Sequence, residues 1–140
     1  MKNFYDYVLK YGIHDCKVDE ISVSNQQIEF KFGSGVYKLN EIGKEVELTN
    51  ESTMIVEIAN LSNLNDRIQI NKIRKNSIKS IDFEKFIYLV KKSKLDIYMN
   101  FYSFFCNTIL IQGYIEKNRY EITISEVKQI FFKFGDTPSF

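Results

Sequence analysis

The sequence contains no tryptophan, one proline, six glycines and only two cysteines among its 140 residues. With so little Pro and Gly, no stretch has the composition of a flexible linker. We therefore predict a single domain over residues 1–140, with 135–140 as a tail. The two cysteines lie ninety positions apart, which excludes the disulfide framework of a small secreted protein.

A large net charge and a long apolar run are also missing. The net charge of +1 gives no overall field to attract nucleic acid or an anionic membrane. No apolar run approaches the roughly 20 residues of a membrane-spanning helix. Asp6 and Lys10 interrupt the N-terminus before the apolar core of a signal peptide develops. We therefore expect a cytoplasmic protein that is not embedded in a membrane.

The sequence is instead rich in alternating apolar and polar residues, the pattern of half-buried strands. Cys16 and Val18 share one phase, whereas Ile21 and Val23 share the other, which predicts a bulge or bend near Asp19. Residues 53–59 are nearly all apolar and predict a strand covered on both faces. The predicted strands are 16–18, 21–23, 28–32, 36–39, 44–49, 53–59, 67–74, 95–102, 107–117, 120–124 and 130–134, and 60–66 is a polar loop.

Two helices are predicted beside these strands. Residues 82–93 carry an apolar stripe, with Asp82 placed to cap the first turn and Lys91 and Lys92 in the last turn. Residues 3–11 predict a short N-terminal helix that Gly12 closes. The fold class is therefore mainly β (α+β): an antiparallel β-sandwich or a partly closed barrel with one covering helix.

His14 and Cys16 are the most reactive pair of neighbours, because His14 is the only histidine. On an extended chain the two side chains share a face, where an imidazole can activate a thiol. Against this catalytic reading, Cys16 has the phase of Val18 on the predicted core face, where a thiol is inert. The structural alternative is that the stretch anchors the N-terminal segment to the first strand.

Other chemistry finds little support. One histidine and two distant cysteines do not make a zinc site, and the five Glu between residues 41 and 57 lack the spacing of a calcium loop. A G-x-S-x-G sequence is absent as well. We expect no metal and no cofactor.

Two segments of opposite charge and a set of tyrosines are the candidates for partner binding. Residues 41–57 have a local net charge of −4 and residues 72–94 one of +6. The basic segment holds one Arg among its cations, so nucleic acid is not the expected ligand. Partner binding is predicted instead for tyrosines on the polar phase of two strands, which interfaces favour, and for two helix lysines: Tyr98, Tyr102, Tyr114, Lys91 and Lys92. The alternative for the tyrosines is that a second layer of the fold, such as the helix, covers them.

The opening pattern consists of Tyr11-Gly12-Ile13-His14-Asp15-Cys16-Lys17-Val18, followed by Ile21 and then Ile28-Glu29-Phe30-Lys31-Phe32. This pattern resembles that of small uncharacterised bacterial cytoplasmic proteins. Some of these are similar to immunity proteins of bacterial toxin systems. The resemblance covers about the first 40 residues and implies a β-rich binding protein with no catalytic residues to carry over. Three hypotheses result: a non-enzymatic protein-interaction domain, a small-molecule-binding β-barrel lined by Phe and Tyr, and an enzyme that uses His14 and Cys16. The oligomeric state is open.

Overall fold

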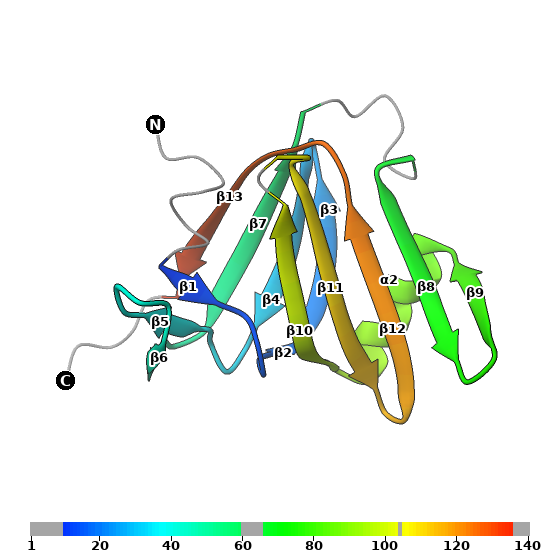
Figure 1. The fold of residues 1–140 in the computed structure, drawn as a ribbon, viewed down its shortest axis with the longest axis horizontal. Helices are drawn as coiled ribbons and strands as arrows, with labels where there is room; N and C mark the ends of the chain where they lie inside the picture. The colour runs from blue at the N-terminus through cyan, green and yellow to red at the C-terminus, as the bar shows by residue number, and fades with distance from the viewer. Residues whose placement is uncertain (1–9, 60–65, 104, 136–140) are drawn as a thin grey trace.

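The computed structural model describes residues 10–59, 66–103 and 105–135 and is mainly β, as predicted (Figure 1). In these ranges, thirteen strands form three antiparallel sheets, and one helix accompanies them. The sheets do not close into a barrel within the described ranges. The predicted loop at 60–66 apart from Asp66, most of the predicted N-terminal helix and the tail after Gly135 lie outside them.

The smallest sheet contains β1 (Tyr11–Gly12), β5 (Tyr37–Leu39) and β6 (Glu45–Leu48). The six-stranded sheet has the order β2 (Lys17–Val18), β10 (Leu95–Ser103), β11 (Thr108–Ile115), β12 (Asn118–Ile124), β8 (Ile68–Arg74) and β9 (Ser77–Ile81). The four-stranded sheet has the order β13 (Val127–Phe134), β7 (Ser52–Ile58), β4 (Gln27–Phe32) and β3 (Glu20–Ser24). The helix is α2 (Phe83–Lys92).

One hydrophobic core joins the two larger sheets and the helix. The inward residues of β4 and β7, such as Phe30 and Val56, belong to the same cluster as Ile111 and Ile122 from β11 and β12. Helix α2 contacts β3 of one sheet and β8 of the other, and its buried side chains are Phe83, Phe86 and Val90. The helix therefore covers the open side between the two sheets, as the prediction of one covering helix requires.

The predicted bend near Asp19 is confirmed and has a clear physical role. Strand β2 pairs with β10 in the six-stranded sheet, whereas β3 pairs with β4 in the four-stranded sheet. Asp19 stands between them and accepts a hydrogen bond from the Gly33 backbone N–H at 2.7 Å, while Lys94 lies 3.2 Å from its other carboxylate oxygen. The bend lets Val18 and Ile21 both face the core although their phases differ.

Two local predictions are wrong, and one strand was not predicted. Tyr11 and Gly12 form β1 rather than the end of a helix, because Gly12 pairs with Tyr37 in β5. Asp82 occupies the position before α2, but its side chain makes no capping hydrogen bond. Strand β9 was not predicted, because four of its five residues are exposed and only Ile81 is buried, so no apolar alternation marks it.

Candidate functional site

The His14–Asp15 turn joins β1 to β2 and is fixed to the six-stranded sheet. The Asp15 backbone N–H donates to the Ile97 carbonyl at 2.9 Å, and the Ile97 N–H donates to the Cys16 carbonyl at 3.0 Å. Asp15 has a φ of 64°, a left-handed conformation that Asp tolerates better than most residues. The stretch is thus a structural junction between β1 and β2, which corresponds to the structural alternative of the sequence analysis.

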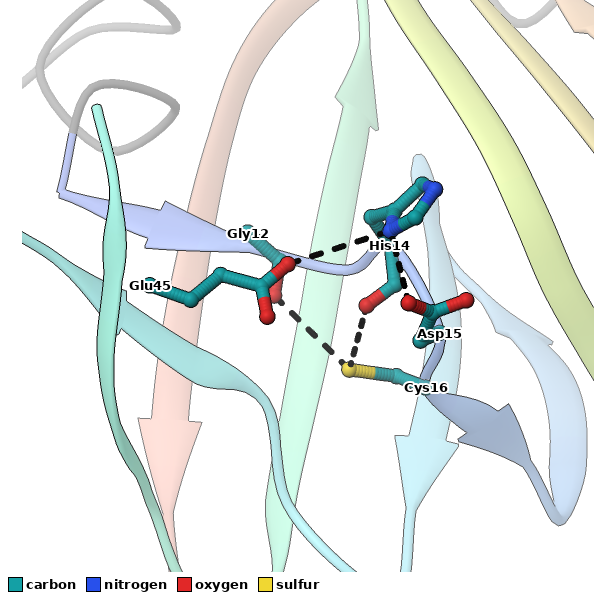
Figure 2. A network of polar contacts seen from close by, with 5 residues as sticks. All are labelled: Gly12, His14, Asp15, Cys16 and Glu45. Carbon is teal, nitrogen blue, oxygen red and sulfur yellow. Dashed lines mark hydrogen bonds and ion pairs between the residues drawn. The ribbon is translucent and has the colours of Figure 1, made fainter.

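The environment of the Cys16 thiol disagrees with the hypothesis that Cys16 is a catalytic nucleophile. Cys16 is 4% exposed, and its Sγ lies 3.7 Å from the backbone oxygens of both Gly12 and His14 (Figure 2). Burial raises the pKa of the Cys16 thiol to about 12, whereas an activated nucleophile needs a lowered pKa. In this arrangement the imidazole does not generate a thiolate.

We expect the two cysteines to differ in their reactivity toward an alkylating reagent. Iodoacetamide should label exposed Cys106 in the native protein at mildly alkaline pH and spare Cys16 until urea unfolds the chain, as mass spectrometry would show. The pKa of Cys16 in the folded chain lies above the ordinary thiol value of 9.0. The neutral buried thiol therefore stabilises the fold fully below pH 9.0. This stabilisation is lost as the pH rises toward 12. Labelling of native Cys16 at the rate of Cys106 would contradict the buried placement; the variant Cys106→Ser provides the control.

The imidazole of His14 faces two carboxylates instead of the thiol (Figure 2). Its Nδ1 lies 3.0 Å from Asp15 Oδ2 and 3.8 Å from Glu45 Oε1. One ligand atom from each of the three residues lies within 4.8 Å of the others, and one nitrogen with two oxygens is a donor set that zinc accepts. All three side chains are exposed, however, and the contacts are those of a polar cluster on the surface. The sequence missed Glu45 because it arrives from β6, thirty positions later.

A β-bulge in β10 decides which tyrosines reach the surface. The register between β10 and β11 shifts between Ile97 and Met99, so Tyr98 is an extra residue and the following alternation changes face. Tyr102 consequently pairs with buried Ile109 and packs against the core, where burial raises the pKa of its hydroxyl. The prediction that Tyr102 shares a face with Tyr98 and Tyr114 is therefore wrong.

Tyr98 and Tyr114 do meet on the outer face of the six-stranded sheet, with ring centroids 5.1 Å apart. The Tyr98 hydroxyl donates to Gln112 Oε1 at 2.9 Å, and the Gln112 amide donates to Glu121 at 2.7 Å. The bulge adds Phe101, which is 60% exposed and pairs with Leu110. We call this surface the outer aromatic face; it consists of Tyr98, Met99, Phe101, Leu110 and Tyr114.

The predicted lysines lie elsewhere. Lys91 and Lys92 are exposed in the last turn of α2. The lysines beside the outer aromatic face are Lys17 and Lys94, which line a shallow depression of about 230 Å³ together with Tyr114. Sequence reasoning missed Lys17 because only the pairing of β2 with β10 brings it there.

A larger depression, of about 370 Å³, opens where α2 begins. Its lining is mostly polar and includes Arg67, Gln69, Asp82 and Ser125. The Phe and Tyr side chains that a ligand-binding barrel would use to line a cavity, such as Phe30 and Phe132, pack within the core cluster. The depression therefore does not match the aromatic-lined cavity of the small-molecule hypothesis.

No family is shown by comparison. The chain matches no protein-family model, no curated protein and no solved structure. In the described ranges, no helix has the length and apolar character to cross a membrane. Any functional conclusion must therefore come from the surface chemistry of the chain itself.

Proposed function

We propose that this chain is a non-enzymatic protein-binding domain that docks its partner on the outer aromatic face. The resemblance of the first 40 or so residues to toxin-immunity proteins leads us to propose a toxin as that partner and the cytoplasm as the place of binding. We propose no cofactor for this activity.

The observation that carries the proposal is the order of Phe101 and Tyr102. The bulge turns the apolar Phe101 ring outward and the Tyr102 ring, with its polar hydroxyl, toward the core. The Tyr102 hydroxyl has a hydrogen bond with Asn100 in the interior, so its burial is compensated. The Phe101 ring, 60% exposed, instead leaves a large apolar surface in water. A partner that covers Phe101 would recover the cost of exposing it.

The neighbours of Phe101 support the same conclusion. Tyrosine and phenylalanine are enriched at interfaces, where they cover a large area at small entropic cost. Tyr98 is held in place by Gln112 and is therefore ordered before binding. A pre-ordered aromatic surface loses less conformational entropy when a partner docks.

The double variant Phe101→Ser/Tyr114→Ser is expected to lower partner affinity by about a hundredfold or more, since aromatic hot spots contribute about 2 kcal/mol or more each. The measurement is co-purification with a tagged chain from its own cell, followed by calorimetry with the partner thus identified. Tyr88→Ser is the matched control, because Tyr88 is 62% exposed but belongs to α2. The proposal fails if the double variant keeps its partner, if Tyr88→Ser loses it equally, or if the unaltered chain retrieves none.

A further inference from the structure

A second surface, at the other edge of the six-stranded sheet, carries an unbalanced positive charge. We call it the basic edge; it consists of Lys72, Arg74, Lys75 and Lys79 from β8, β9 and their turn, with Lys85, Lys91 and Lys92 from α2. Asp82 and Glu84 are the only acidic residues between positions 72 and 92. Within the described part of the chain, none of the seven cations forms an ion pair.

The centre of the basic edge is unfavourable for the folded chain by itself. Lys72 in β8 lies directly opposite Lys79 in β9, and like charges in that position destabilise a sheet. Arg74 follows two residues later on the same face. This face is also the one on which α2 packs, because Lys72 pairs with Tyr120 and the Tyr120 ring lies 5.4 Å from that of Phe86. The fold gains nothing from this arrangement of charges, so an anionic ligand is its simplest explanation.

The shape of the surface indicates what kind of anion it fits. Strand β9 ends the sheet and, in the part of the chain that the structure describes, pairs only with β8. A strand in this position leaves backbone N–H and C=O groups available to a further strand. Its side chains alternate: Lys79 faces the same way as Lys72, whereas Ile78, 69% exposed, pairs with Ile73 on the other face.

We propose that the basic edge binds an extended acidic segment of a partner protein, which adds to β9 as a seventh strand of that six-stranded sheet. Acidic residues at every second position of that segment lie on the face that carries Lys79, and one of them lies next to Lys79, whose partner across the strand pair is Lys72 in β8. The residues between them are apolar and lie beside Ile78. The segment thus offsets the Lys72–Lys79 repulsion with negative charge, satisfies the free edge of β9 and covers an exposed isoleucine.

A protein segment fits better than nucleic acid for two reasons. Among the seven cations, only Arg74 can donate two parallel hydrogen bonds to one phosphate. The free edge of β9 offers backbone hydrogen bonds that a peptide strand can complete and a sugar–phosphate chain cannot match in spacing. The basic edge shares no residue with the outer aromatic face, so this inference and the proposed function are tested with different variants.

The probe is a short synthetic peptide in which Glu and Val alternate, labelled for fluorescence anisotropy. The unaltered protein is expected to bind it, and Lys79→Glu should weaken binding about tenfold, by removing one attraction and adding a repulsion. The matched control is Lys44→Gln/Lys133→Gln, two exposed lysines outside the basic edge, and it should bind like the unaltered protein. A second peptide, with Pro in place of each Val, keeps the charge but cannot add as a strand, so it should bind much more weakly.

A stability measurement guards against a variant that merely misfolds. Lys79→Glu places opposite charges across the strand pair, so its Tm should rise while peptide affinity falls; Lys72→Gln/Lys79→Gln should show the same two directions. The proposal is overturned if the Glu–Val peptide does not bind, if the Pro peptide binds equally well, or if Lys79→Glu leaves affinity unchanged. It is also overturned if a single-stranded oligonucleotide competes with the peptide and binds more tightly, or if these lysines instead join a second copy of this chain, as a salt-dependent mass in light scattering would show.

Discussion

Gly35→Ala is expected to lower the free energy of unfolding by about 3–4 kcal/mol, the sum of a left-handed strain of about 1–2 kcal/mol and a packing clash of similar or larger size. Gly35 has a φ of +86°, and an added Cβ would overlap the Thr49 carbonyl oxygen and lie 2.6 Å from that of Asn50. Both clashing atoms belong to the backbone, which cannot rotate away. The neighbouring Val36 N–H donates to Thr49 Oγ1 at 2.9 Å, and the Thr49 N–H returns a bond to the Val36 carbonyl at 2.7 Å. The clash therefore forces apart the segment that joins β4 to the small sheet.

Gly43 provides the control for this substitution. Its φ of +81° is nearly the same, but an added Cβ meets nothing within 4 Å. Gly43→Ala should thus show the left-handed strain alone, about 1 kcal/mol. Urea unfolding of both variants gives the comparison, with an unchanged m value indicating that the unfolded states are alike. Equal losses at the two positions would show that the close approach of Thr49 and Asn50 to Gly35 does not exist in solution.

Phe86→Ala is expected to cost about 3–5 kcal/mol, the usual range for a fully buried phenylalanine. Phe86 is 0% exposed and meets the Tyr120 ring at 5.4 Å. Because α2 contacts both β3 and β8, the cavity would open where the helix holds the two sheets together. A loss of that size is a large part of the total stability of an ordinary domain.

Tyr88→Ala is the matched control on the same helix. Tyr88 is 62% exposed, so truncating it should change the stability by no more than about 0.5 kcal/mol. Thermal unfolding followed by circular dichroism measures both variants, and Phe86→Ala should unfold at a much lower temperature. Comparable shifts for the two variants would mean that α2 does not bury Phe86 between the sheets.

Much of the fold was predictable because apolar alternation is a local property. Helix α2 falls within the predicted 82–93, and the opposed phases of Val18 and Ile21 located the bend at Asp19. The buried Ile55 agrees with the prediction that residues 53–59 are covered on both faces. These features follow from which side chains must leave water, and neighbouring residues in the sequence carry that information.

The candidate sites were less predictable. Tyr98 and Tyr114 were expected on one polar face, and they meet there. The bulge at Tyr98 moved Tyr102 inward and Phe101 outward, and no local pattern marks an inserted residue in an otherwise regular strand. The contact of His14 with Glu45 and the pairing of Lys72 with Lys79 across two strands depend on which strands become neighbours.

The sequence by itself determined a mainly β chain with one covering helix and a bend at Asp19, and it favoured a core position for Cys16. The tertiary structure alone decided which aromatic rings are exposed on β10 and which cations gather beside β9. The physical reason is the range of the interactions involved. Burial of apolar residues imposes a period that short segments display, whereas strand order and register result from pairing between segments far apart in the chain.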